Sequence, residues 1–281
     1  TNAEVEDVIS SQELDAGFVR AALDPEESSR VDTEDEQLLM IVDIPMVEKS
    51  SVEDGGQMFT TIPMGIVVAQ NAVITVCLED SIILRSIAEG AVKGVHTSLK
   101  TRFVFQILLR IAGRFLKNLR MIERDFTRIE KRLYDSLKNE ELIQLLGLSK
   151  SLVYFSSSLK GNEVTMEKVL RGRVLKLYED DRDILEDALI EVRQAIEMAN
   201  IYSNIMAGTM DAYASVVSNN LNIIMKVLTV ITILMTIPNI VFSFYGMNVQ
   251  DMPLPHTWFP VTLSIAITGL TWLLLKKKNL Y

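Results

Sequence analysis

Histidine and cysteine are scarce in this chain of 281 residues, which contains two histidines and one cysteine. Cys77 has no second cysteine to pair with, so no disulfide forms within the chain, and we expect the soluble part to be cytosolic. His96 and His256 are too few, even with Cys77, to build a zinc-type centre in one chain. A nucleophile elbow and a glycine-rich phosphate loop are also missing. These absences predict that the protein is not an enzyme.

Charged residues are missing from two long stretches near the C-terminus. Val227 to Phe244 is a run of 18 uncharged residues, and Phe259 to Leu275 is a run of 17. A helix of that length reaches across a hydrocarbon core about 30 Å thick, because each residue adds about 1.5 Å. The two runs therefore predict two transmembrane helices, at about 227–244 and at 259–275.

Basic residues lie at one end of this helical hairpin only. Lys226 precedes the first run and residues 276–278 are all lysine, whereas the loop 245–258 has no Lys or Arg. The positive-inside rule then predicts a multi-pass protein of the plasma (inner) membrane with cytoplasmic N- and C-termini. Tyr245, Trp258 and Phe259 would lie at the outer interface, where aromatic rings are favoured.

The first part of the chain is strongly acidic. Residues 1–80 contain 18 acidic and three basic residues, a net charge of −15, whereas residues 81–140 carry +7. This balance excludes nucleic acid as a natural partner and suits cations or a solvated surface. Residues 1–11 show no signal peptide. The start without methionine suggests a trimmed N-terminus.

Residues 1–80 predict an acidic α/β cytosolic domain with a mainly antiparallel sheet. Its β-branched runs predict strands, the first of them ended by Pro45, and Gln70-Asn71 predicts a hairpin turn between the last two. Residues 1–35 are expected to form short helices and loops. The expected strands cover residues 36–45, 58–62, 64–69 and 72–78.

The rest of the soluble part predicts helices only. Residues 81–182 form a helical cytosolic region, with helices over 99–137 and 139–159, a turn at Lys160-Gly161-Asn162, and another helix to about 175. A stalk helix over 183–244, about 90 Å long, continues into the first transmembrane helix. The outer loop 245–258, the second transmembrane helix and a basic tail, 276–281, complete the fold class: an α+β cytosolic domain, a helical stalk and two C-terminal transmembrane helices.

A polar stripe follows the first transmembrane helix. Its members recur every three or four residues, which places them on one helical face. Polar groups inside a membrane are costly unless they face water or a partner. The stripe therefore favours a ring of helices around an aqueous path, while hydroxyls bonded back to their own helix would favour simple helix contact. The stripe consists of Asn222, Met225, Thr229, Thr232, Thr236, Asn239 and Ser243.

The stripe contains no carboxylate, which a dehydrated divalent ion would require. Amides and hydroxyls suit a cation that keeps its water shell. Mg²⁺ dehydrates reluctantly, so hydrated Mg²⁺ is the expected transported ion. The residues leave Co²⁺, Ni²⁺ and Zn²⁺ open, although the scarcity of His and Cys disfavours a soft-metal specialist.

Tyr245-Gly246-Met247-Asn248, between two C-terminal helices and with a basic tail, resembles the signature of the CorA family of magnesium transporters. The resemblance extends over nearly the whole chain. It implies a homopentameric, funnel-like channel in which the first membrane helix of each copy lines the pore. Gly246, Met247 and Asn248 would then form the outer mouth, where Asn248 meets the hydrated ion.

The same resemblance assigns roles to residues on the long helix. Asn222 matches a polar ring at the cytoplasmic pore entrance, and Met225 with Leu228 matches an apolar gate. Asp187 and Asp211 fall where family carboxylates bind a regulatory divalent ion or face the axis. The chain departs from the family in that Leu254 follows the loop proline, which leaves Asp251 as the only acid of the loop.

Two other functions fit the sequence. A zinc or cobalt/nickel transporter of the same family would share every feature above. A membrane-anchored sensor or scaffold would use the hairpin only as an anchor, and would not need the polar stripe. Neither a nucleic acid nor an organic substrate is expected as a partner.

Overall fold

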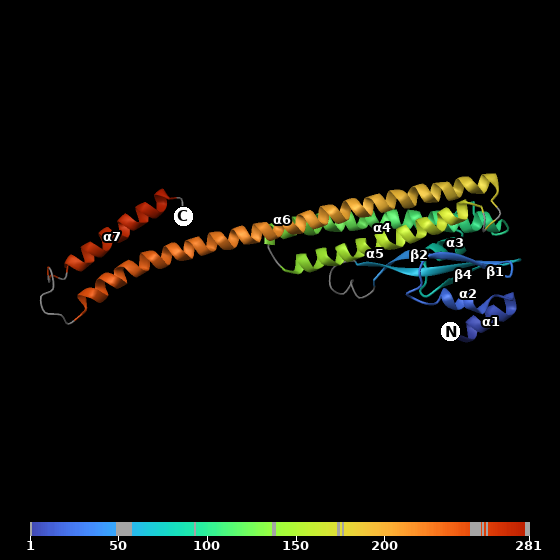
Figure 1. The fold of residues 1–281 in the computed structure, drawn as a ribbon, viewed down its shortest axis with the longest axis horizontal. Coiled ribbons are helices and arrows are strands. Elements are labelled where there is room, and N and C mark those ends of the chain that lie inside the picture. The colour runs from blue at the N-terminus through green and yellow to red at the C-terminus, as the bar shows by residue number, and fades with distance from the viewer. Residues whose placement is uncertain are drawn as a thin grey trace. The chain divides into compact units, whose positions relative to one another are not determined.

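The computed structural model describes all residues except 1, 49–57, 93, 137, 138, 173, 174, 176, 248–253, 255, 257 and 279–281. The chain divides into two compact units, Thr1–Thr209 and Met210–Tyr281. Helix α6 (Glu179–Tyr245) contributes residues to both units (Figure 1). Each unit is described by itself below.

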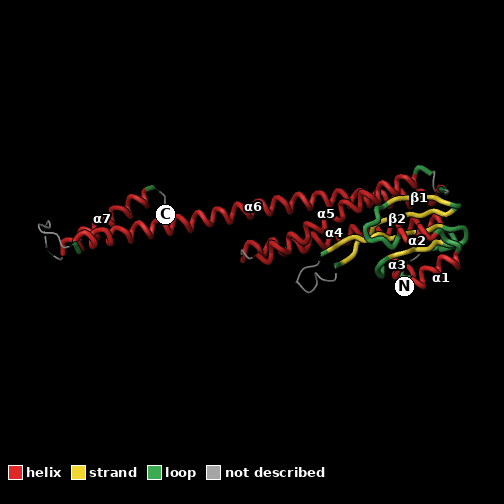
Figure 2. Tube along the Cα trace, turned by 60° about the horizontal axis from the view of Figure 1, so that its bottom comes forward, coloured by secondary structure: helices red, strands yellow, loops and turns green. Residues whose placement is uncertain are grey.

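The first unit is built on a four-stranded antiparallel sheet in the order β1-β2-β3-β4. Helices α1 and α2 lie on one side of the sheet, and α4 and α5 lie on the other (Figures 1 and 2). The strands are β1 (Arg30–Glu34), β2 (Gln37–Val47), β3 (Phe59–Val68) and β4 (Val73–Cys77). The helices are α1 (Asn2–Gln12), α2 (Ala16–Ala21), α3 (Ile82–Ala88), α4 (Lys100–Ser136), α5 (Asn139–Leu170) and the first part of α6.

Both faces of the sheet are buried. On one face, Leu39, Ile41 and Val67 pack with Phe18 and Val19 of α2. Side chains of a strand alternate between faces, so the intervening residues cover the other face, toward α4 and α5. These are Leu38, Met40, Val42, Ile44, Met64 and Ile66, each at most 4% exposed.

Two predictions about the strands were wrong. Pro45 does not end β2, which continues to Val47, and the two runs on either side of Pro63 form the single strand β3. The backbone N–H and C=O of Asp43 both bond to the Asn162 side chain and so face away from β3. Pro63 lies opposite Asp43, so the nitrogen of Pro63 faces away from β2. Pro45 lies two residues after Asp43, so its nitrogen faces away from β3 as Asp43 does. Both prolines therefore sit where the ladder needs no donor.

The sequence also missed strand β1, because residues 30–34 are charged and lack the apolar alternation of a buried strand. Its ladder with β2 runs from Arg30 opposite Ile41 to Glu34 opposite Gln37. The predicted hairpin at Gln70-Asn71 is confirmed, since Ala69 N–H donates to Ala72 C=O at 2.9 Å.

The predicted turn at Lys160-Gly161-Asn162 was wrong, because α5 runs without a break to Leu170. A Cβ on Gly161 would lie 3.1 Å from the Ser29 hydroxyl oxygen, so a close approach to the loop before β1 explains the glycine. Asn162 is fully buried, and its amide replaces the strand neighbour that Asp43 lacks beyond the end of β1. Tertiary contacts thus outweigh the local turn preference of Gly-Asn.

Asp43 carries a half-buried carboxyl beside α5. Burial raises the pKa of this carboxyl, and the Ser158 and Ser29 hydroxyls oppose the rise. Because the folded-state pKa is raised, the contribution of this group to stability is full below the unfolded pKa of about 3.9 and is lost as pH rises through the folded pKa. At neutral pH the charged carboxylate therefore destabilises the fold.

The variant Asp43→Asn is expected to melt about 2–4 °C higher than wild type at pH 7.5, the shift of roughly 1 kcal/mol in a domain of this size. This gap should close as pH falls toward about 4. Thermal unfolding of both proteins across that pH range measures it, with Glu34→Gln, at an exposed site, as control. A lower melting temperature of Asp43→Asn at pH 7.5 would mean that the serine hydrogen bonds outweigh desolvation.

Among the described residues, no strand follows Cys77, as the sequence predicted. Helix α4 matches the predicted 99–137 helix almost residue for residue. The predicted stalk and first transmembrane helix are one helix, α6, which passes through Pro238 without ending. The second apolar run forms α7 (Trp258–Lys277).

Candidate functional site

The second unit consists of the later part of α6 and of α7. Both helices are long and apolar enough to cross a membrane, by length and composition. Their large apolar side chains remain exposed in the single chain: Met235 is 72% exposed and Ile265 is 68% exposed. Apolar surface of this extent requires lipid or further protein to cover it.

The two helices lie side by side and antiparallel. The rings of Tyr245 and Phe259 are 6.1 Å apart where α6 ends and α7 begins. At the opposite end, Val230 and Ile233 of α6 line one groove with Leu275 of α7. The side of α6 with Val230 and Val241 is buried, so the contact with α7 uses an apolar side of α6.

The polar stripe lies on the exposed part of α6. Every residue of the stripe is exposed in the single chain. The hydroxyls of Thr229, Thr232 and Thr236 donate to the backbone carbonyls four residues earlier, at 2.7, 2.8 and 2.7 Å. This bonding back to the helix was part of the alternative interpretation, and it is present. It also fixes each hydroxyl proton, so only the lone pairs of these oxygens remain for another group.

The two stripe asparagines differ from the threonines. Neither Asn222 nor Asn239 forms a side-chain hydrogen bond with any residue that the structure describes. Asn222, Met225 and Thr229 also line the groove of about 400 Å³ that reaches Leu275, together with Lys226 and Asn219. The sequence did not single out Asn219, although it lies three residues before Asn222 on the same face.

The loop motif is described in part. Gly246 follows the last turn of α6, and its N–H donates to Phe242 C=O at 2.9 Å. A Cβ at this position would lie 3.1 Å from that oxygen, so close backbone contact, rather than a left-handed conformation, explains the glycine. Met247 is exposed, while Asn248 and Asp251 lie outside the described residues.

The two predicted regulatory carboxylates lie on α6 in different units. Asp187 and Asp211 are both exposed. Among the described residues, no group of three or more His, Cys, Asp or Glu side chains could hold a metal within one chain. Asp187 acts on Glu191, whose pKa is raised first by burial and then by Asp187, while Arg110 and Arg120 oppose the rise.

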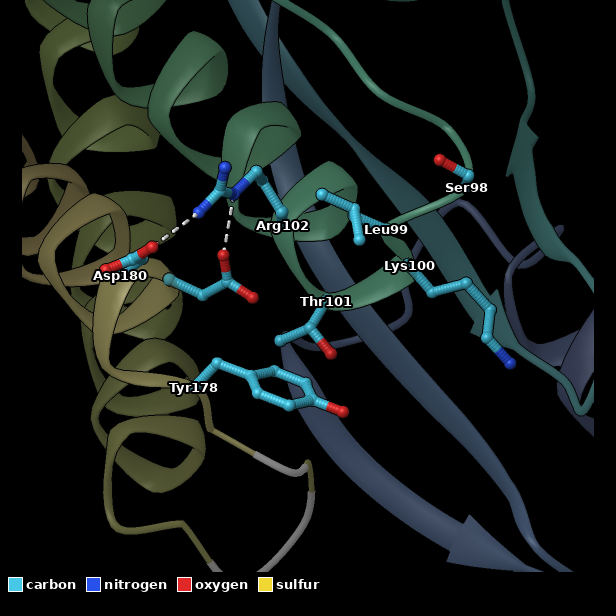
Figure 3. A pocket seen from close by; sticks show the side chains of 8 residues that line it. Ser98, Leu99, Lys100, Thr101, Arg102, Tyr178 and Asp180 are labelled. Atoms are coloured by element: carbon cyan, nitrogen blue, oxygen red, sulfur yellow. Dashed lines mark hydrogen bonds and ion pairs between the residues drawn. The ribbon is translucent and has the colours of Figure 1, made fainter.

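A pocket of about 470 Å³ lies where α4 and α6 begin (Figure 3). The guanidinium of Arg102 lies 2.7 Å from the buried Asp181 carboxylate and 3.6 Å from that of Asp180. Thr101 and Tyr178 point into the same space. Because Arg102 pairs with Asp180 and Asp181, two of the three acids in the first turn of α6, this pocket joins two helices and offers no unpaired charge at these three residues.

Residues 1–277 match the family described as CorA-like Mg²⁺ transporter protein. The chain belongs to this family. It is 27% identical over 262 residues to the cobalt/magnesium transport protein CorA of Methanocaldococcus jannaschii, which spans 89% of this chain and 78% of that protein. It is 32% identical over 129 residues to the protein of the same name from Thermotoga maritima, covering 41% and 37% of the two chains.

The fold is also that of a solved CorA structure. The complete structure of the CorA magnesium transporter from Methanocaldococcus jannaschii is similar with a TM-score of 0.87, 22% sequence identity and coverage of 100% of this chain and 89% of that one. The predicted fold class, with its α+β domain, long helix and two apolar C-terminal helices, is confirmed. CorA-family membership also agrees with the resemblance drawn from the Tyr-Gly-Met-Asn motif.

Proposed function

We propose that this CorA-family chain forms a channel that passes hydrated divalent cations, chiefly Mg²⁺, across the plasma membrane. The polar stripe of α6 carries this proposal, because it lies exposed on a helix that is otherwise apolar. One helix supplies only one wall of an aqueous path. Several copies around an axis, five by analogy with the family, would enclose it.

The hydrogen bonding of the threonines favours cations. Water molecules bound to a cation direct their hydrogens outward, and therefore need acceptors around them. The hydroxyls of Thr229, Thr232 and Thr236 have already given their protons to the helix, so they offer lone pairs only. The shell around an anion directs oxygens outward and would find no donor at these positions. The stripe can thus favour hydrated cations without any carboxylate.

The ends of the hairpin support the proposed orientation. Lys226 and the lysines that end α7 lie at the same end, because α6 and α7 are antiparallel, and Lys276 Nζ lies 5.2 Å from the Trp272 ring centre. At the other end, the rings of Phe244, Tyr245, Trp258 and Phe259 form a chain of contacts with centroids 5.7 to 6.1 Å apart. Lysines inside and an aromatic belt outside are the expected arrangement.

The proposal also assigns the gate and the regulatory ion sites to residues of α6. Met225 and Leu228 would form the apolar constriction, and Asn222 the polar ring beside it. Asp187 is exposed next to Glu191, so a divalent ion there would need ligands from another copy. Cytosolic Mg²⁺ bound between copies at Asp187, or near the axis at Asp211, would stabilise the closed state by binding it more tightly than the open state.

Uptake of Mg²⁺ into proteoliposomes tests the proposed function. Wild-type protein should take up Mg²⁺ well above empty vesicles, and Asn248→Ala should lower the uptake severalfold, because a ring of amide acceptors for metal-bound water is lost at the mouth. Asn204→Ala, at an exposed position of α6 in the first unit, is the control and should match wild type.

Three outcomes separate the hypotheses. Uptake that falls only in Asn248→Ala supports a channel with its mouth at the Gly-Met-Asn motif. Equal uptake in all variants keeps the channel and contradicts the role of Asn248. Folded protein without uptake in any variant would support the sensor or scaffold hypothesis. Repeating the assay with Co²⁺, Ni²⁺ and Zn²⁺ ranks the ions.

A further inference from the structure

A second pocket, of about 530 Å³, lies between α3, α4 and α6 in the first unit. Three cationic side chains of α4 line it, and they share one helical face because their spacing is four and three residues. These are Arg110, Arg114 and Lys117. The apolar side chains of Ile82, Ile83 and Leu109 form another wall, and Glu191 of α6 supplies the one carboxylate.

The three cations of this pocket have no direct partner, although the charge of Arg110 acts on Glu191. None of them forms a hydrogen bond or ion pair with a described residue, and the buried Nε atom of Arg114 lacks any acceptor. Two other arginines of the unit show the contrast: Arg102 pairs with Asp181, and Arg193 pairs with Glu163 and Glu167. A buried guanidinium nitrogen without an acceptor costs free energy, and an anion in this pocket would supply that acceptor.

The single carboxylate of Glu191 does not neutralise the three cations. Its carboxylate is directed at the backbone of α4 beside Gly113, where a Cβ would lie 3.3 Å from Oε2. Its charge and the three cations leave the pocket with a net charge of about +2. Arginine and lysine in this arrangement are the groups that proteins use to bind phosphate oxygens.

We propose that this pocket binds a polyphosphate anion of the nucleoside triphosphate class. The phosphates would contact Arg110, Arg114 and Lys117, and the apolar wall of Ile82, Ile83 and Leu109 would cover the nucleoside. A single inorganic phosphate would use only the cationic part of the pocket and would bind more weakly. The binding site lies outside the polar stripe and does not depend on ion conduction.

The carboxylate of Glu191 should decide whether the free polyphosphate or its magnesium complex binds more tightly. A carboxylate in the pocket repels a free polyphosphate, whereas a Mg²⁺ ion on the phosphates removes the repulsion and gains an oxygen neighbour. The magnesium complex of ATP should therefore bind more tightly than ATP in the presence of a chelator. Removing the carboxylate should strengthen the binding of free ATP and abolish the preference for its magnesium complex.

Calorimetric titration of the full chain in detergent tests this site, with ATP, AMP and inorganic phosphate as probes, each with and without Mg²⁺. Arg114→Gln combined with Lys117→Gln should weaken ATP binding at least about tenfold, because two charge-assisted hydrogen-bonding groups are lost. Glu191→Gln should tighten binding of free ATP. Arg193→Gln removes a cation outside the pocket and should bind like wild type.

Each result decides the proposal. Tight binding of ATP that the double variant loses and Arg193→Gln keeps supports the site, and equal affinity for phosphate alone would contradict the role of the apolar wall. The absence of ATP binding to wild type overturns the proposal. A change of oligomeric state in the double variant, measured by light scattering without ATP, would also overturn it, because the cations would then bind the acidic surface of another copy. None of these readings requires ion transport.

Discussion

Replacing Thr232 and Thr236 together by valine is expected to reduce Mg²⁺ uptake by at least about tenfold. Valine has nearly the same shape as threonine, but it offers no lone pair to the water shell of the ion. Each lost hydrogen bond costs about 1 kcal/mol, and about 1.4 kcal/mol corresponds to a factor of ten. Two successive rings of acceptors would become apolar, and an apolar constriction resists wetting.

Serine and a second threonine supply the controls for this prediction. Thr232→Ser combined with Thr236→Ser keeps both hydroxyls and should retain most of the uptake. Thr262→Val removes a hydroxyl of α7 that is bonded back to its helix in the same way, but lies off the stripe, and should leave uptake unchanged. If the valine pair conducts like wild type, α6 lines the path with another face or not at all.

Asn162→Ala is expected to destabilise the first unit by roughly 3 kcal/mol or more, because it leaves the N–H and C=O of Asp43 without partners. The same change removes one acceptor of the Ser29 hydroxyl, the Oδ1 atom of Asn162, and opens a cavity at a fully buried position. In a domain of this size the melting temperature should fall by about 10 °C. Thermal unfolding of the solubilised full chain measures the shift.

Asn200→Ala is the matched control for this change. Asn200 lies on α6, is exposed, and among the described residues its side chain hydrogen-bonds only with Ser156, whose hydroxyl donates at 3.4 Å. Its loss should change stability by less than about 0.5 kcal/mol. Equal melting temperatures for Asn162→Ala and Asn200→Ala would show that water replaces the buried amide at Asp43.

The sequence predicted the features that depend on neighbours within a few turns of helix. The uncharged run before Tyr245 and the three-to-four spacing of Thr229, Thr232 and Thr236 are local patterns, and both are found in α6. The turn at Gly161 and the end of β2 at Pro45 were wrong because distant contacts decide them. Asp43 and Asn162 are 119 residues apart, and no local pattern joins them.

The two candidate sites also differ in whether local sequence or distant contacts decide them. The stripe of α6 could be found from spacing because all its members lie on one helix. The pocket with Arg110 and Arg114 could not, since their spacing is also that of a solvated helical face, and Glu191 and Ile82 come from other elements. Only the structure shows that Arg114 lacks an acceptor there.

The short length of β1 has a consequence for how the chain avoids aggregation. Beyond Ile41, no strand among the residues that the structure describes pairs with the outer side of β2, and a bare strand edge attracts strands of other molecules. Asn162 occupies the first hydrogen-bonding position of this edge, and Pro45 removes the donor from the next. The edge is therefore open during synthesis until α5 packs, and loss of Asn162 would leave it open to edge-to-edge pairing in the finished protein as well.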